Sequence, residues 1–274
     1  MKNNPGIVVL LTRHHLGSLI FVNNLIKEGV NIKAIVQSDT FFSKNNNLHN
    51  FIKRIRRMGI SLFIQITLML IYMQIGLNMS FILSFFGINQ KILSLKQISK
   101  KYNIPMIRTT DINSNKTYNE IKSIEPDIIV SCYFNQILEN RILSLAKVNT
   151  VNVHSSLTQK YRGLNNYFWV LVNNERESGV TIHEIDEGID TGKIIAQRTV
   201  KINNTDTAMA VFIRLSQECA ELFLNSIEKI INKKSTINDT SQSKYYSFPT
   251  KEAYWKFLKT GRKLYYLSDF STLF

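Results

Sequence analysis

The sequence is poor in cysteine, in proline and in acidic residues. Its 274 residues include two cysteines, four prolines and 20 Asp or Glu, against 34 Lys or Arg. Cys132 and Cys219 lie far apart and form no CxxC or His/Cys cluster, which excludes a disulfide framework and gives no support for a bound metal. The N-terminus carries no cleavable signal pattern, so we expect the protein to be cytoplasmic.

The shortage of acidic residues leaves a strongly basic chain. Its formal net charge is +14 and its isoelectric point is near 9.7. Such a charge indicates an anionic partner, which could be nucleic acid, a phosphorylated substrate or a membrane surface. The alternative is a solvated basic surface without a partner, because the lysines are scattered along the sequence.

Charged residues of either sign are absent from Met58 to Gln90. A basic stretch, Lys53 to Arg57, comes just before, and the apolar run 61–88 is long enough to cross a bilayer. A single span here would place two halves of one sheet on opposite sides of a membrane, so we reject it. We expect an apolar helical insertion at about 41–90, in which a pair of buried helices covers the sheet. The alternative is a hairpin that contacts a membrane surface through 53–88.

The rest of the chain alternates strand and helix patterns. Residues 6–11 and 31–38 are apolar runs typical of buried strands, and 14–29 between them has helical spacing. This β–α–β opening is of the Rossmann type and predicts an α/β fold with a mainly parallel sheet. No G-x-G-x-x-G follows the first strand, so a dinucleotide is not supported. Further strands are expected at 104–110, 127–134, 150–156, 179–186 and 193–202, and helices at 91–103, 113–126, 135–146, 163–175 and 205–234.

The predicted body, 1–234, is followed by a basic and aromatic C-terminal extension, 235–274. We place the N-cap of the long helix that closes the body at Thr205. The extension is interpreted as a terminal helix that packs its aromatic rings onto the body. The alternative is a lid over a substrate that carries phosphates or a planar base, because aromatic faces and Lys/Arg both bind such groups.

The run VNTVNVHSSL, 148–157, carries the strongest chemical signal. On a strand, Asn152 and His154 point to the same face, opposite to the valines between them. A histidine can move a proton near neutral pH, and an asparagine amide can donate to a developing oxyanion. Asp190, in EGIDTGKII, could orient the histidine and raise its pKa. These three side chains suit acyl transfer to an amine that attacks directly, with no Ser or Cys nucleophile.

The surrounding residues strengthen this interpretation. NVHSSLTQKYRG, followed by SGVTIHEIDEGIDTGKIIAQ, resembles the folate-dependent formyltransferase family, which includes methionyl-tRNA formyltransferases and sugar-nucleotide N-formyltransferases. The resemblance covers roughly 91–232 and the opening β–α–β unit. The matching residues are Asn152, His154, Ser156, Leu157, Arg162, Gly163, Asp190 and Gly192. Ser155, Thr158 and Gln159 depart from the family pattern, which has Pro, Leu and Pro there, so the loop loses two fixed φ angles.

The resemblance implies a Rossmann-like formyltransferase fold with 10-formyltetrahydrofolate as the formyl donor and no metal. It implies that His154 is the general base, that Asn152 holds the formyl oxyanion and that Asp190 sets the histidine. The donor-binding residues it implies, on the loop 155–163 and the turn 186–192, are Ser155, Ser156, Leu157, Tyr161, Arg162, Gly163, Ile185, Asp186 and Gly188. Acceptor-binding candidates lie at expected strand ends and are His14, His15 and Asn113. We interpret His183 as structural.

The acceptor implied by the resemblance is an amine on a small molecule. About forty residues follow the long helix, too few for the C-terminal barrel with which methionyl-tRNA formyltransferases grip tRNA. We therefore favour an amino-sugar nucleotide, whose diphosphate would meet Lys or Arg. The alternatives are a methionyl-tRNA formyltransferase-like enzyme and a non-catalytic membrane-peripheral protein on the same scaffold. The broad apolar face of 205–234 would also suit a homodimer.

Overall fold

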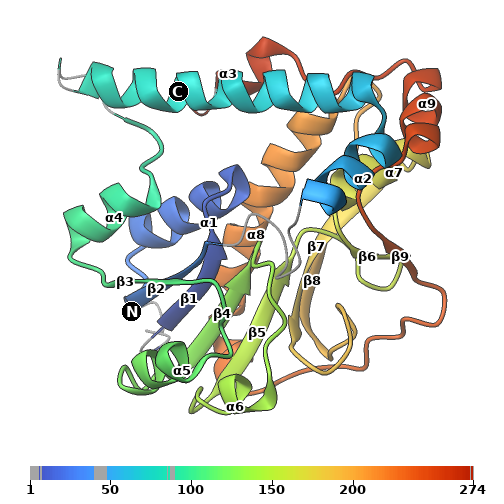
Figure 1. Ribbon diagram of the computed structural model, residues 1–274. Coiled ribbons are helices and arrows are strands. Elements are labelled where there is room, and N and C mark those ends of the chain that lie inside the picture. Colours follow the sequence, from blue (N-terminus) through green and yellow to red (C-terminus); the bar gives the residue numbers. More distant parts are fainter. Residues whose placement is uncertain are drawn as a thin grey trace.

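The protein is described here from a computed structural model. The described residues are 6, 8–39, 48–84, 86, 90–271 and 273. Parts of the predicted insertion, 41–47, 85 and 87–89, lie outside the described residues. Figure 1 shows a central sheet with helices against both of its faces, and one long helix, α3 (Ile60–Ser84), lying across one end of the molecule.

The sheet has seven strands in the order β3-β2-β1-β4-β5-β7-β8. The first five in this order are parallel, and the last two are joined antiparallel. The strands are β1 (Val8–Arg13), β2 (Ile32–Ser38), β3 (Met106–Thr109), β4 (Ile128–Cys132), β5 (Asn149–His154), β7 (Glu177–Glu184) and β8 (Ile194–Lys201). This arrangement confirms the predicted α/β fold with a mainly parallel sheet.

Both faces of the parallel strands are covered by helices. Val8 and Leu10 of β1 face a core shared with one group of helices, whereas Val9 and Leu11 face a second, smaller core. The first group comprises α1 (Leu16–Lys27), α4 (Leu95–Tyr102) and α8 (Ala208–Ile231). The opposite face is covered by α5 (Asn115–Lys122) and α6 (Asn140–Leu143). Burial on two sides explains why the strands are continuous apolar runs in the sequence.

The C-terminal extension packs onto the body, as predicted. It contains β9 (Lys244–Tyr246), α9 (Lys251–Lys259) and a 3₁₀ turn at Leu267–Phe270. Phe257 of α9 lies against Phe168 of α7 (Asn166–Val172), with ring centroids 5.1 Å apart. β9, which was not predicted, pairs in parallel with β6 (Tyr161–Gly163) in the loop after β5.

Two predictions about helices are wrong. The long helix α8 is capped by Thr207, whose Oγ1 accepts a hydrogen bond from the Ala210 N–H at 2.9 Å, and not by Thr205. The helix predicted at 135–146 is reduced to the four residues of α6. Before α6 the chain makes tertiary hydrogen bonds in place of helical ones, because Asn113 holds the Ile137 carbonyl and the Glu139 N–H.

The favoured interpretation of the insertion is also wrong. The insertion forms a short basic helix, α2 (Leu48–Met58), and the single long helix α3, which meet at Gly59 in a left-handed conformation with φ +82°. α3 is not buried, because only one of its sides packs on the body. An apolar composition on every side of a helix predicts burial, but here the fold leaves one side uncovered.

Candidate active site

β5 places Asn152 and His154 as the strand periodicity predicts. Val151 and Val153 belong to the main core, so the two polar side chains point to the other side of the sheet. β5 runs beside β4 on one edge and antiparallel to β7 on the other, with Asn152 opposite His183 in register. The pair therefore sits where parallel strands end, the position at which open α/β sheets bind ligands.

Asp190 reaches this pair from the turn between β7 and β8. It has φ +56°, a left-handed conformation that residues other than glycine seldom adopt. Its Oδ1 lies 3.5 Å from His154 Nδ1 and accepts a hydrogen bond from Asn152 Nδ2 at 3.3 Å. Its Oδ2 accepts a hydrogen bond from the Gly163 N–H at 2.8 Å. The structure thus brings together the three residues that the sequence analysis placed in catalysis.

The surroundings of His154 make it a neutral base. Its Nε2 lies 3.0 Å from Asn166 Nδ2, an amide that donates, so the lone pair is on Nε2 and the proton is on Nδ1, toward Asp190. This tautomer is assigned from the hydrogen-bond network. Burial lowers the pKa of His154 below its ordinary 6.5, and the negative charge of Asp190 opposes the shift without cancelling it. A lowered pKa keeps the imidazole uncharged at neutral pH.

Asp190 is held in its charged form. Burial by itself would raise the pKa of this carboxyl group, but His154, His183 and the Gly163 N–H together lower it below its ordinary value. A permanently charged carboxylate next to Nδ1 fixes the tautomer of His154. A carboxylate in this position can also stabilise the imidazolium form of the ring.

His183 and Asn166 are site residues that the sequence analysis did not identify. His183, interpreted as structural, is 3% exposed; its Nδ1 donates to the Glu184 carbonyl at 2.7 Å and its Nε2 accepts from Asn152 at 3.1 Å. Asn166 begins α7 and touches His154. The alternation of β7 could have revealed His183, because it points to the face that carries Asn152. No spacing rule points to Asn166.

The loop after His154, residues 155–163, is named the catalytic loop and is held by contacts within the protein. The Ser155 side chain hydrogen-bonds the Tyr133 hydroxyl, and Ser156 Oγ donates to the Tyr161 carbonyl. Tyr161 donates its hydroxyl to Glu175 at 2.9 Å. The Leu157 side chain packs against the backbone of Gly179. Since Ser156 and Tyr161 use their polar groups in this way, contact of these residues with the donor stays a prediction.

The end of this loop meets the Asp190 turn. Gly163 has φ +91°, and a Cβ there would lie 2.2 Å from the Tyr246 carbonyl oxygen, so only glycine is accommodated. Arg162 Nη1 donates to the Ile189 carbonyl at 3.4 Å, while its Nε is buried and has no hydrogen-bond partner among the described residues. Loop and turn therefore form one connected wall of the site.

The turn that follows β7 is organised by Asp186. Its Oδ1 accepts hydrogen bonds from the Gly188 N–H at 3.1 Å and from Thr191 Oγ1 at 2.7 Å. Ile185 is half-buried at the start of the turn. A cleft of about 480 Å³ lies beside the turn, and its lining residues are Ile137, Leu138, Glu139, Asn140, Arg141, Leu143, Asp186 and Glu187.

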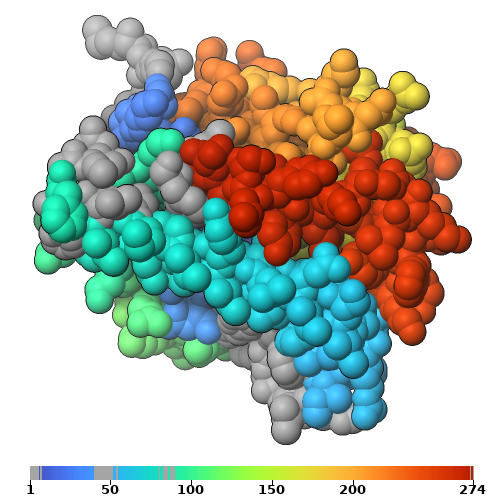
Figure 2. All heavy atoms as spheres, turned by 90° about the horizontal axis from the view of Figure 1, so that it is seen from above, coloured from blue at the N-terminus to red at the C-terminus, as the bar shows by residue number. Residues whose placement is uncertain are grey.

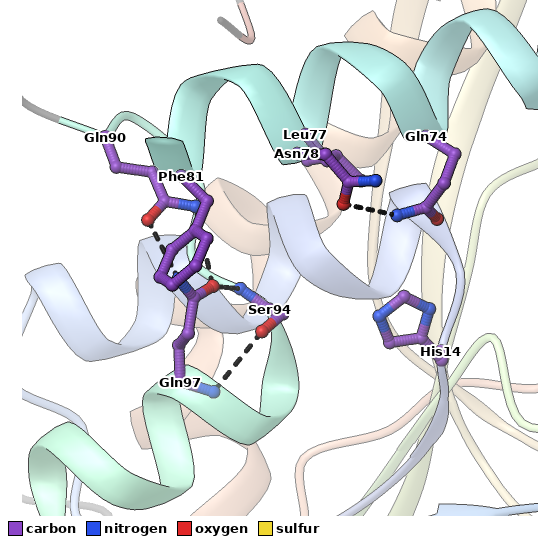
Figure 3. A pocket seen from close by; sticks show the side chains of 8 residues that line it. All are labelled: His14, Gln74, Leu77, Asn78, Phe81, Gln90, Ser94 and Gln97. Atoms are coloured by element: carbon purple, nitrogen blue, oxygen red, sulfur yellow. Dashed lines mark hydrogen bonds between the residues drawn. The ribbon is translucent and has the colours of Figure 1, made fainter. Parts of the chain in front are cut away.

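The predicted acceptor residues fall into three environments. Asn113 uses its amide to hold the Ile137 carbonyl and the Glu139 N–H, at 2.9 and 3.0 Å, and so supports two residues that line the cleft beside the Asp186 turn. His14 is exposed and lines a cleft of about 210 Å³ beneath α3 with Gln74, Asn78 and Gln97 (Figure 3). Burial, with help from the charge of Arg13, lowers the pKa of His15 to about 3.

His15 belongs to a cluster that adjoins the catalytic loop. Its ring lies 5.3 Å from that of Tyr133, the residue that hydrogen-bonds Ser155. Arg13, the last residue of β1, is largely withdrawn from water, and this burial lowers its pKa. No carboxylate among the described residues forms an ion pair with Arg13. An unpaired and partly buried guanidinium next to the site suits an anionic ligand.

The fold and the site define a class of enzyme. A Rossmann-like α/β sheet that gathers a neutral histidine, a charged carboxylate and an amide at the carboxyl ends of its strands is arranged for proton transfer during group transfer. Residues 86–227 match the formyl transferase family, and the chain belongs to that family. The resemblance expected from residues 152–192 is thereby confirmed.

Relatives and solved structures agree with this assignment. The GDP-perosamine N-formyltransferase of Brucella melitensis is 40% identical over 106 residues, 39% of this chain and 41% of the relative. The methionyl-tRNA formyltransferase of Methylacidiphilum infernorum is 35% identical over 136 residues, 50% of this chain and 42% of the relative. The chain therefore spans less than half the length of these two curated relatives.

A solved structure shares the fold over most of the chain. The N-formyltransferase from Helicobacter canadensis, in complex with folinic acid and dTDP-3-aminofucose, matches with a TM-score of 0.54 and 23% sequence identity. The match covers 87% of this chain and 70% of that one. At this identity the likeness establishes the fold alone.

Proposed function

We propose that this chain transfers a formyl group from 10-formyltetrahydrofolate to the primary amine of an amino-sugar nucleotide. The carrying observation is the state of His154, a neutral imidazole whose Nε2 lone pair accepts a hydrogen bond from Asn166 and whose Nδ1 faces the charged Asp190. Membership of the formyl transferase family supports the reaction type. The 40% identity to a GDP-perosamine N-formyltransferase supports the class of acceptor.

The cleft beside the Asp186 turn suits the donor. Apolar side chains from 137–143 offer a surface for a flat ring, and the carboxylates of Glu139 and Glu187 can accept hydrogen bonds from ring N–H groups. The buried Nε–H of Arg162, at the wall of the site, has no partner among the described residues and could donate a hydrogen bond to the folate. When bound, the donor supplies a formyl carbon that accepts an electron pair from the attacking amine.

The chain's own residues then move the proton and balance the charge. His154 Nε2, released from Asn166, takes a proton from the attacking amine and returns it to the leaving nitrogen. Asp190 stabilises the imidazolium in between. Asn152 would support the formyl oxygen as it gains negative charge, by exchanging its 3.3 Å hydrogen bond to Asp190 for one to that oxygen.

The acceptor's phosphates would lie near Arg13. This cation stands at the carboxyl end of β1, in the cluster that continues through His15 and Tyr133 to the catalytic loop. A guanidinium binds phosphate oxygens in two-pronged geometry and is less strongly hydrated than an ammonium group. A diphosphate held there would leave the sugar amine free to reach the space beside His154.

The test is turnover of purified protein with 10-formyltetrahydrofolate and a panel of amino-sugar nucleotides, with charged initiator tRNA as a further acceptor. We expect release of tetrahydrofolate with at least one nucleotide. The His154→Ala variant should lose about 10²–10⁴-fold in kcat, the usual contribution of a general base. The Arg13→Ala variant should raise the KM for the acceptor while changing kcat little.

The outcomes separate the alternatives. Turnover with tRNA alone would replace the sugar-nucleotide acceptor and keep the reaction. Absence of both turnover and donor binding, measured by titration with folinic acid, would overturn the proposal in favour of a non-catalytic protein on this scaffold.

A further inference from the structure

α3 exposes an unbroken apolar stripe. The stripe residues are three or four positions apart, as a single helix face requires, and each is between 47% and 69% exposed. They are Ile60, Ile64, Leu68, Ile71, Ile75, Met79 and Ile82. From Ile60 to Ile82 the stripe extends over about 33 Å of α3. Monomeric soluble proteins rarely leave so continuous an apolar surface in water, so the stripe indicates an interaction site.

The opposite side of α3 is fixed to the body. Leu62 is 1% exposed, the Gln65 side chain hydrogen-bonds the Tyr254 hydroxyl, and Tyr72 lies 5.2 Å from Phe270 between ring centroids. Within the described residues, Ile60–Met79 of α3 is the one stretch of helix long and apolar enough to cross a membrane. Because its inner side is anchored, α3 lies along the molecule and does not leave it as a span.

The stripe is basic at the end next to α2. The sequence 40–110, which includes α2 and α3, contains ten Lys or Arg and no Asp or Glu, and one of the ten, Arg108 on β3, pairs with Asp39. Lys53, Arg56 and Arg57 are exposed on α2, at one end of α3, and Lys251 of α9 lies against the α2–α3 junction at Gly59. Figure 2 shows α2, α3 and the C-terminal segment forming one face of the molecule. This face thus combines an apolar centre with cationic side chains.

We propose that this face docks on an anionic lipid bilayer, with α3 parallel to the surface and its stripe among the outer acyl chains. An interfacial helix buries its apolar side at the headgroup boundary and is strengthened by Lys and Arg that meet anionic headgroups. A second copy of the chain fits the face less well, because pairing would bring two basic regions of the same sign together. The inference does not depend on the proposed catalytic function.

Docking in this way would orient the site. α3 lies over the end of β1, where His14, Gln74 and Asn78 line the 210 Å³ cleft (Figure 3). One helix diameter, about 10–12 Å, would then separate the bilayer surface from this end of the sheet. An acceptor that approaches from the membrane side would meet the amide-lined cleft first.

The experiment is sedimentation of the full chain with vesicles of phosphatidylcholine alone and of phosphatidylcholine with phosphatidylglycerol. We expect binding to the anionic vesicles that weakens with salt. The Ile71→Glu/Ile75→Glu double variant should bind at least about tenfold more weakly, since two charges enter the buried side of the interface. Arg56→Glu/Arg57→Glu should lose the preference for phosphatidylglycerol. Ile237→Glu, at an 84% exposed isoleucine outside the stripe, is the matched control and should bind like the parent chain.

Circular dichroism and thermal unfolding establish that each variant is folded, which is expected because the changed side chains point into solvent. Unaltered vesicle binding by the folded Ile71→Glu/Ile75→Glu variant would overturn the proposal. So would a concentration-dependent dimer that this variant abolishes, in a parent chain that ignores both kinds of vesicle.

Discussion

Asn152 makes two side-chain hydrogen bonds within the site. Both hydrogens of its amide are used, one on His183 Nε2 at 3.1 Å and one on Asp190 Oδ1 at 3.3 Å. The first bond fixes the amide plane, because His183 is itself held by the Glu184 carbonyl. The second is longer and weaker, so it is the one that a ligand oxygen could replace. Asp190 thus accepts from Asn152 a hydrogen bond that a ligand oxygen could replace, and it stays the partner of His154.

The first prediction concerns Asp190→Asn and the pH dependence of turnover. The active form needs neutral His154, so kcat/KM should fall as the pH drops through the pKa of this histidine, which lies below 6.5. The charge of Asp190 raises that pKa, and its removal should therefore move the acid limb to still lower pH. The maximal rate should drop by about 10²–10⁴-fold, because the imidazolium loses its counter-charge.

The measurement is a pH–rate profile of kcat/KM for the parent chain and for Asp190→Asn. Asp239→Asn, which removes an exposed carboxylate outside the site, should leave the profile unchanged and serves as the control. An acid limb that moved upward in Asp190→Asn would contradict the assigned roles of both residues.

How well each site residue could be predicted depends on whether it belongs to a local sequence motif. Asn152 and His154 are neighbours on one strand, and Asp190 lies in a turn with its own pattern, so a local motif carries all three. Asn166 reaches His154 only because the loop after β5 folds back and begins α7 there. That contact depends on the path of a loop, which no period in the sequence encodes.

At the scale of elements, the catalytic loop is stiffened by the C-terminal extension. The loop lacks two prolines of the family pattern, at Ser155 and Gln159, and therefore two fixed φ angles. In their place β9 pairs with β6, and Tyr246 stacks on Tyr161 with centroids 5.1 Å apart. These contacts hold the loop at β6 against the C-terminal extension.

The second prediction tests this support with Tyr246→Ala. Loss of the stacked ring and of the hydrogen bond from Asn173 to the Tyr246 hydroxyl should reduce the free energy of unfolding by about 1–3 kcal/mol. Because β6 leads into Gly163, which positions Asp190, kcat should fall as well. Urea unfolding and turnover assays measure the two effects. Tyr102→Ala, at an exposed ring of α4, is the control, and equal losses in both variants would refute a specific role for the Tyr246 ring.

The insertion shows where sequence reasoning about an element fails. The absence of charge from Met58 to Gln90 correctly predicts an apolar helical segment. It does not reveal which sides of the helix meet protein, because the composition of α3 is apolar all round. The number of surfaces available to cover α3 is a property of the whole fold, and among the described residues α9, the C-terminal segment and the α1–α4 region lie against one side of it.

At the scale of the whole molecule, basic charge is unevenly distributed. Residues 40–110 account for +10 of the net charge of +14. The acidic residues are confined to the remaining parts of the chain, where several form ion pairs. One of these pairs, Asp206 with Arg214, fixes the start of α8 beside the C-terminal extension and is a candidate for a stabilising contact.

Asp206 connects β8, α8 and the C-terminal extension. Both of its carboxylate oxygens accept hydrogen bonds from the Arg214 guanidinium at 2.8 Å, and the Asn203 N–H adds a third at 2.7 Å. Its backbone carbonyl accepts from Arg262 of the extension at 3.1 Å. Burial alone would raise the pKa of Asp206, but Arg214 and Asn203 lower it below its ordinary value.

The third prediction is that Asp206→Asn destabilises the protein in a pH-dependent manner. A carboxylate whose pKa is lower in the folded state stabilises the fold above its unfolded pKa, about 3.9, and that stabilisation is lost as the pH falls through the folded value. Asp206→Asn should therefore unfold more easily than the parent at pH 7, by about 1–3 kcal/mol for the lost charged hydrogen bonds. The difference should shrink toward pH 3, where the parent also begins to lose the charge. Urea unfolding at pH 3, 5 and 7 measures it, with Asp239→Asn as a control, and a difference independent of pH would show that the ion pair is not its source.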